Sequence, residues 1–232
     1  MKFWNKYHKA YNKFVELSPS YNELLNLVVK NLKLRNSDII LDAGCGPGQI
    51  SKKLLDMGHE VHSIDNSKKA LKLLNEKHKN AKLYHADLGN KLLFPNNLFD
   101  RIICINTLYV FKKKHLHLIV KEFYRIIKKG GIIVVTDPLK SFKNIKIFKN
   151  DCRLFFKNYG FFRGLFFIIK NIKIYIILLY FNKIIDRKAK GGFYNFFSVK
   201  DYISLFSKNN FRVINSQIVY AGQNIMLIAI KD

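Results

Sequence analysis

The 232-residue sequence predicts an α/β fold, in which a Rossmann-like, doubly wound and mostly parallel sheet carries helices on both faces. Three observations predict it. Short apolar segments alternate with longer segments of helical periodicity, a glycine-rich turn follows the first apolar segment, and the sequence ends in a predicted antiparallel hairpin. With 49% hydrophobic residues the chain can bury a core, so we expect a single domain over residues 1–232.

The first part of the chain predicts the alternation directly. Ser18 can cap a helix and Pro19 suits its first turn, so a helix is expected before the first strand. Gly130-Gly131 is predicted to end the last helix of this part. The predicted strands are 39–41, 61–64, 82–85, 99–105 and 132–135, and the predicted helices between them are 48–57, 67–78 and 115–128.

The alternation stops after Pro138 and resumes at Ser198, where Ser-Val-Lys-Asp predicts a capping box for a helix ending near Asn209. Residues 211–220 and 224–230 follow as the two strands of the hairpin. The intervening segment is too long to lack structure in a compact domain, so a helical lid insertion is expected. The predicted parts are an N-terminal helical cap (1–35), a cofactor-binding core (36–138), an apolar, basic lid (139–197) and a C-terminal helix with its hairpin (198–232).

The net charge of +25 has two interpretations. It indicates a polyanionic partner, nucleic acid or an acidic membrane face, or it reflects compositional drift toward lysine. Drift is favoured because the lysines are spread evenly, and nucleic acid is the less favoured partner.

Cys45, Cys104 and Cys152 form no Cys-x-x-Cys pair, which argues against a disulfide framework and a zinc site. The N-terminus lacks the apolar core of a signal peptide. We therefore expect no metal and a cytoplasmic location, with the inner face of the membrane as an alternative position.

Residues 41–48, Leu-Asp-Ala-Gly-Cys-Gly-Pro-Gly, predict a turn that cradles a nucleotide, because glycine lets the backbone turn tightly and approach a ligand. Asp65 stands about 20 residues beyond the first glycine, the spacing at which an acid holds a ribose diol. A nicotinamide dehydrogenase would require glycine where Gln49 stands. Asp42, Asp65 and Asp87 all follow predicted strands at one sheet edge, which favours a cationic ligand over a pyrophosphate.

Together these motifs resemble the class I S-adenosylmethionine-dependent methyltransferases, especially the small-molecule type 11 branch, over roughly residues 38–138. The resemblance rests on residues 41–48, Asp65, Ala86-Asp87-Leu88, 99–103 and 125–131. It implies a methyltransferase with S-adenosyl-L-methionine as its cofactor. Lys129 stands where the family commonly has proline, which leaves the binding assignments intact.

The resemblance also implies roles for individual residues. The three glycines would line the cofactor's amino acid and ribose, Asp42 would orient the turn or the ammonium group, Asp65 the ribose and Asp87 the adenine amino group. The Leu88 backbone would face the ring, and Asn106 would flank the methionine portion. The expected cofactor-binding set is Asp42, Gly44, Gly46, Gly48, Asp65, Asn66, Asp87, Leu88, Asn106 and Tyr11.

Tyr11 is chosen from four aromatic residues, Trp4, Tyr7, Tyr11 and Tyr21, in the region that closes over cofactor and acceptor in similar enzymes. The alternative is that these rings only pack an N-terminal helix on the sheet.

The catalytic residues are unknown at this point. Methyl transfer from a sulfonium depends mainly on in-line placement, so a dedicated base is not required. If the acceptor is a hydroxyl group, the candidates are His115, His117, Tyr109 and Asp137, although polar residues in such positions usually just face water.

Residues 154–185 are the most apolar part of the chain and contain Arg163, Lys170, Lys173 and Lys183. Because two of these lysines interrupt the apolar run, a membrane-spanning helix is not expected. The segment either lies on an anionic membrane or packs on the core as a buried lid.

In both cases an apolar lid predicts a small, hydrophobic or lipid-like acceptor. The alternatives are an RNA methyltransferase that uses the basic surface and a non-catalytic module that binds a membrane surface or a partner. The oligomeric state is left open.

Overall fold

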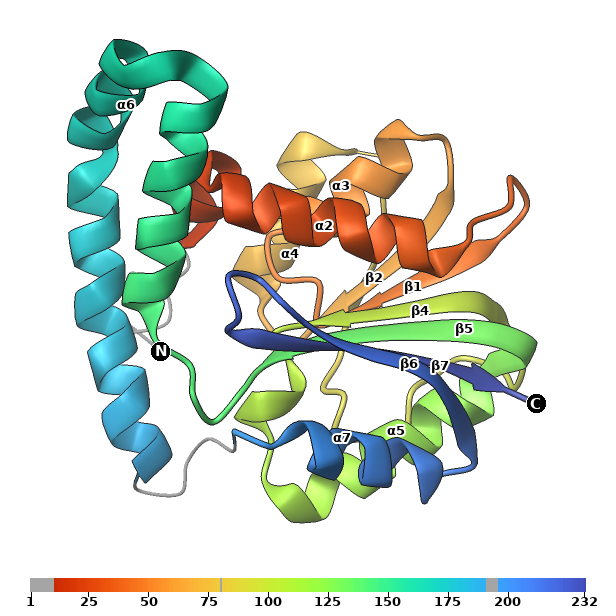
Figure 1. Ribbon diagram of the computed structural model, residues 1–232. Helices are drawn as coiled ribbons and strands as arrows, with labels where there is room; N and C mark the ends of the chain where they lie inside the picture. Colours follow the sequence, from red (N-terminus) through yellow and green to blue (C-terminus); the bar gives the residue numbers. More distant parts are fainter. Residues whose placement is uncertain (1–10, 80, 191–195) are drawn as a thin grey trace.

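The computed structural model describes residues 11–79, 81–190 and 196–232. Its centre is a seven-stranded sheet in the order β3-β2-β1-β4-β5-β7-β6 (Figure 1). The neighbours from β3 to β5 are parallel, whereas β7 pairs antiparallel with both β5 and β6. The predicted sheet, including its antiparallel hairpin, is confirmed. The strands are β1 (Ile39–Ala43), β2 (Glu60–Asp65), β3 (Lys82–His85), β4 (Phe99–Ile105), β5 (Ile127–Pro138), β6 (Phe211–Val219) and β7 (Asn224–Lys231).

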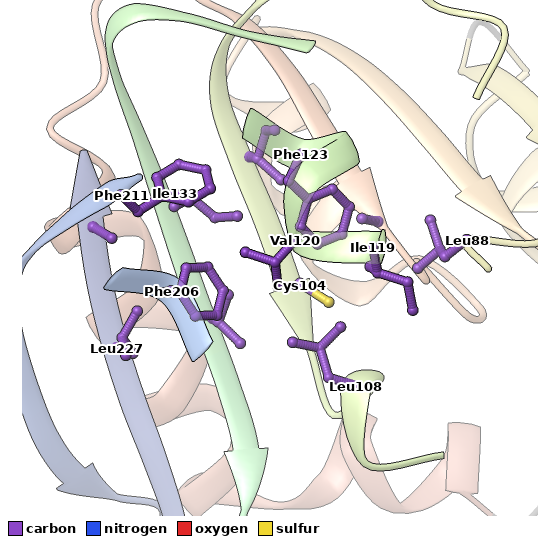
Figure 2. Close-up of a cluster of buried hydrophobic side chains, with 14 of the residues drawn as sticks. Leu88, Cys104, Leu108, Ile119, Val120, Phe123, Ile133, Phe206, Phe211 and Leu227 are labelled. Atoms are coloured by element: carbon purple, nitrogen blue, oxygen red, sulfur yellow. The ribbon is translucent and has the colours of Figure 1, made fainter. Parts of the chain in front are cut away.

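Helices cover both faces of the sheet (Figure 1). On one face, α5 and α7 bury Phe123 and Phe206 against the strands, as Figure 2 shows. On the other face, α2 and α3 bury Val28 and Leu54. Such two-sided cover is why the central strands β1, β4 and β5 are apolar on both faces. The helices are α2 (Pro19–Leu32), α3 (Gln49–Asp56), α4 (Lys68–Lys77), the short 3₁₀ helix η1 (Leu108–Val110), α5 (Lys113–Ile126), α6 (Asn144–Lys190) and α7 (Val199–Ser207).

The two predicted helix starts are confirmed by their caps. The Ser18 hydroxyl accepts a hydrogen bond from the Tyr21 amide at the start of α2. At the start of α7, Ser198 and Asp201 form the reciprocal capping box.

The prediction that Gly130-Gly131 ends a helix is wrong. α5 already ends at Ile126, because Ile127 pairs with Phe99 in the sheet. The register then shifts, so that Arg101 pairs with Ile132, and the glycines lie in this irregular part of β5. Gly130 has a left-handed φ of 74°, which is common at a β-bulge.

The insertion forms α6, which bends at Gly160 (φ 74°, ψ 174°) into two arms. Figure 1 shows these arms as a helical hairpin at one end of the sheet, beside the start of α2. Its two ends meet where Leu139 bridges Phe197. The insertion is therefore closed at its base and stands against the edge of the sheet to which the parallel strands point.

Candidate functional site

A cavity of about 1000 Å³ lies at the carboxyl ends of the parallel strands, between the sheet and α6. Loops that follow β1, β2, β3 and β4 line one end of it, and α6 lines the other. In doubly wound folds this edge is where ligands bind.

The glycine-rich turn joins β1 to α3 at the floor of the cavity. The Gly44 and Cys45 amides both donate to the Ile64 carbonyl, which fixes the turn against β2. A Cβ atom at Gly44 would lie 2.4 Å from Thr107, whereas one at Gly46 would meet no heavy atom within 4 Å. Gly46 is therefore the position at which the backbone is open to a ligand.

Gly48 has a different role from the one expected. It does not line the cavity; a Cβ atom there would lie 2.4 Å from Leu74 of α4, and Gly48 is the N-cap of α3 with a left-handed φ of 79°. Its lack of a side chain lets α3 and α4 pack closely.

Asp65 ends β2 and lies at the cavity wall. Its carboxylate accepts from the Gly46 amide through Oδ2 and from the Ser67 amide through Oδ1, both at 2.8 Å. Two backbone donors hold the group in place, yet each oxygen keeps a lone pair for a further donor. Asn66, beside it, also lines the cavity.

Asp87 and Leu88 follow β3 and line the cavity together. Asp87 is exposed and accepts from the Gly89 amide at 2.8 Å, whereas the Leu88 side chain is buried in the core. The rim here also carries the exposed Lys68 and Lys69, so it is of mixed charge.

Asp42 is almost fully buried beneath the turn and accepts a hydrogen bond from the Ser51 hydroxyl of α3. Ser51 in turn contacts Ser63 of β2 at 2.8 Å. Burial raises the pKa of Asp42 to about 7, and the nearby Asp65 carboxylate acts in the same direction. Asp42 thus ties β1 to α3 through Ser51.

Asn106 follows β4 with a left-handed φ of 52° and lines the cavity with Tyr11. Its amide Nδ2 lies 3.5 Å from the Tyr11 hydroxyl. The fully buried Asn224 of β7 donates to Asn106 Oδ1 at 2.6 Å. Asn224 was missed in the sequence because no local motif connects it with a residue 118 positions away.

Of the predicted catalytic candidates, the structure brings only Tyr109 to the cavity, where its ring stacks on Phe196 at 5.7 Å. Asp137 is fully buried behind it, accepts from the Leu108 amide, and does not line the cavity. Burial raises the pKa of Asp137 to about 8. His115 and His117 lie on α5 and do not line the cavity.

Apolar and aromatic side chains line the α6 end of the cavity. Both arms contribute, and the tyrosines include Tyr11, Tyr21 and Tyr220, whose neighbouring rings lie 6.3 and 5.9 Å apart. Trp4 and Tyr7, the other predicted aromatic residues of this region, lie outside the described residues. The cavity residues from α6 and the loops at its two ends include Phe142, Ile147, Phe148, Tyr175, Leu178 and Phe196.

The sequence model of a family described as "Methyltransferase domain" matches residues 40–131. The chain is 27% identical over 125 residues to the ubiquinone biosynthesis O-methyltransferase of Pelagibacter ubique, which covers 50% of this chain and 51% of that protein. It is 32% identical over 125 residues to the malonyl-[acyl-carrier protein] O-methyltransferase of Pectobacterium atrosepticum, covering 53% and 47%. The chain thus spans about half the length of the curated relatives it matches.

The fold is similar to that of a TehB-like SAM-dependent methyltransferase from Corynebacterium glutamicum, with a TM-score of 0.66, 12% identity, and 98% and 97% of the two chains covered. The glycine turn and the acids Asp42, Asp65 and Asp87 all lie within the matched segment. Residues 40–131 therefore match the sequence pattern of a methyltransferase domain, and the described fold is similar to that of an S-adenosylmethionine-dependent methyltransferase.

Proposed function

We propose that this protein is an S-adenosylmethionine-dependent methyltransferase that acts on a small, apolar acceptor. The observation that carries the proposal is a single cavity with two unlike ends. Fixed carboxylates and open backbone line the end at the sheet, and apolar or aromatic side chains line the end at α6. A polar, cationic cofactor and an apolar acceptor would therefore meet in the middle.

The residues at the sheet end fit this cofactor. Its ribose diol requires two acceptors at one place, and Asp65 offers two oxygens that backbone amides already hold in position. Gly46 leaves room for close approach, and Asp87 can accept from an amino group at the outer end. The cofactor, when bound, supplies a methyl group on a positively charged sulfur, and the Asp65 carboxylate at the cavity wall suits that charge.

We propose that the chain contributes to the reaction mainly by holding the cofactor and the acceptor in position. Asn224 fixes Asn106, which lies beside Tyr11 where the two ends of the cavity meet. Burial raises the pKa of Tyr11 and of Tyr21, so these phenols keep their protons at neutral pH and serve as hydrogen-bond donors rather than bases. Holding the two reactants in line can supply most of the lowering of the barrier.

The apolar end supports the class of acceptor. One relative is named as an O-methyltransferase of ubiquinone biosynthesis. Another is named as an O-methyltransferase of malonyl-[acyl-carrier protein]. We propose an acceptor with a hydrophobic body, reached in the cytoplasm at or near a membrane surface.

Calorimetry with S-adenosylmethionine tests the cofactor assignment. We expect wild-type protein to bind, and Asp65→Ala to weaken binding by about tenfold or more, because hydrogen bonds to a charged group contribute about 1.5–3 kcal/mol. Asp232→Ala, which removes the same charge at an exposed position remote from the cavity, is the matched control. No binding by wild type, or equal binding by the Asp65 variant, would overturn the proposal.

Incubation of a cell extract with the enzyme and methyl-labelled cofactor tests the acceptor. We expect label in the fraction that partitions into organic solvent. Label in RNA instead would favour the alternative suggested by the net charge of +25, and label in no fraction, despite cofactor binding, would favour a non-catalytic module.

A further inference from the structure

The outer side of α6 carries an exposed apolar ridge. After the bend at Gly160, large apolar side chains recur every three or four residues and so occupy one face of the second arm. Phe162 is 84% exposed and Phe166 68% exposed, values that are unusual for phenylalanine. The outer ridge consists of Phe162, Phe166, Ile169, Ile172, Ile176 and Tyr180.

The opposite face of the same arm is apolar as well. Tyr175, Leu178 and Phe181 are buried in the core cluster that also contains α2. A helix that is hydrophobic all round is normally buried on all sides. Among residues 11–79, 81–190 and 196–232, only the inner side of this arm is covered. Figure 1 shows the second arm as the part of α6 farther from the sheet.

The charges around the ridge all have one sign. Every charged residue from 157 to 183 is basic, and Arg163, Lys170, Lys173 and Lys183 are exposed. Asp151, on the first arm, is fully buried and adds nothing to this surface. An apolar stripe flanked by lysine and arginine matches the chemistry of an anionic lipid surface, in which acyl chains lie below phosphate groups.

Two other occupants fit less well. A second copy of the chain, packed ridge to ridge, would bring the same cations together. Insertion across a bilayer is permitted by length and composition, since Asn144–Phe181 contains an 18-residue window apolar enough, 33% of which is buried. A membrane-spanning helix would nevertheless lose two contacts of Tyr175. These are the hydrogen bond from its hydroxyl to Asp151 and the edge-on contact of its ring with Phe14.

We propose that the outer ridge of α6 docks this protein on anionic membranes, lying in the interface with its apolar side chains in the acyl region and its lysines at the phosphates. Docking would also bring the cavity to the lipid, because Leu179 is 37% exposed beside the ridge and lines the cavity. This last consequence rests on the proposed function, since it gives an apolar acceptor a lateral route from the bilayer. The docking itself does not depend on methyl transfer.

Vesicle flotation tests the proposal with the full chain. We expect binding to vesicles of phosphatidylglycerol and phosphatidylcholine, little binding to phosphatidylcholine alone, and weaker binding at high salt. Ile169→Ser should lower the partition coefficient about tenfold. Ile218→Ser on β6 is the matched control, because the two isoleucines are 63% and 61% exposed, and it should bind like wild type.

Lys170→Gln and Lys173→Gln should each weaken binding to the anionic vesicles by about fivefold, whereas Lys200→Gln on α7 should not. Equal flotation of Ile169→Ser and Ile218→Ser would overturn the proposal. The proposal would also be overturned if wild type does not bind vesicles and instead forms a dimer in sedimentation analysis that Ile169→Ser dissociates.

Cofactor calorimetry on the same variants separates this inference from the proposed function. Retained cofactor binding with lost flotation supports docking, and it also shows that the variant is folded. If Ile169→Ser fails to fold, hydrogen exchange of wild type decides instead: residues 161–181 should gain protection with anionic vesicles, and unchanged exchange there would refute docking.

Discussion

Replacing Asp151 with alanine should release α6 from the rest of the domain. Asp151 lies on the first arm and is fully buried. It accepts from the Ser18 hydroxyl at 2.8 Å, the Ser20 amide at 2.9 Å and the Tyr175 hydroxyl at 3.0 Å. One carboxylate therefore joins both arms of α6 to the start of α2.

The size of the effect follows from the donors that would lose their acceptor. All three belong to residues that are at most 5% exposed, and a buried donor without a partner costs about 1–3 kcal/mol. The hydroxyls of Ser18 and Tyr175 can rotate toward other acceptors, but the Ser20 amide cannot. Relief from desolvation, which raises the pKa of Asp151, offsets part of the loss. We expect Asp151→Ala to lower the free energy of unfolding by about 2–4 kcal/mol.

Urea unfolding followed by far-ultraviolet circular dichroism measures this change. Tyr175→Phe removes one of the three hydrogen bonds and should lower stability by about 1 kcal/mol. Asp56→Ala, at an exposed carboxylate that also has several partners, should have little effect, because solvent screens its ion pairs.

Hydrogen exchange locates the change within the molecule. In Asp151→Ala, amides in residues 144–181 should exchange faster than in wild type, while those of β1 and β4 keep their protection. An Asp151→Ala variant within 1 kcal/mol of wild type, or one whose α6 exchanges normally, would refute the reasoning that this carboxylate holds the insertion in place.

Two further predictions concern Gly44 in the glycine turn and the buried acid Asp137. Gly44→Ala should lower the free energy of unfolding more than Gly58→Ala. Both glycines have a left-handed φ, but only at Gly44 would the new Cβ clash with Thr107. Equal losses of stability in urea unfolding would contradict the packing described. Since burial raises the pKa of Asp137 to about 8, its stabilising contribution is complete below its unfolded pKa near 3.8 and is lost as the pH rises through 8. Asp137→Asn, which stays neutral, should therefore flatten the decline in stability between pH 5 and 9 relative to wild type, and parallel curves would exclude the assignment.

Local signals in the sequence were sufficient where a single residue type determines the backbone. Ser18 and Ser198 predicted helix starts, and the three glycines predicted the tight turn after β1, because caps and left-handed turns depend on neighbours within a few residues. The Gly130-Gly131 error had a tertiary cause. The pairing of Ile127 with Phe99 ends α5 early, and no local pattern reports such a pairing.

The buried polar contacts were beyond the sequence for the same reason. Asn224 reaches Asn106 across 118 residues, and Asp151 reaches Ser18 across 133. The apolar character of residues 154–185 was visible, but the bend at Gly160 that turns them into two arms was not, because glycine within a helical pattern usually signals only a weaker helix.

The cavity has one end at the sheet and one at α6, and we expect different residues to determine cofactor affinity and acceptor specificity. The cofactor end is formed by loops fixed to the sheet, as the bonds from Gly44 and Cys45 to Ile64 illustrate. The apolar end, which we propose receives the acceptor, is lined in part by α6. This helix is connected to the core through the base of the insertion at Leu139 and Phe197 and through Asp151. Because the two ends are held by different contacts, substitutions on the inner face of α6 should alter acceptor choice while leaving cofactor affinity intact. A change in α6 that impaired both equally would mean that the insertion helps to shape the cofactor end as well.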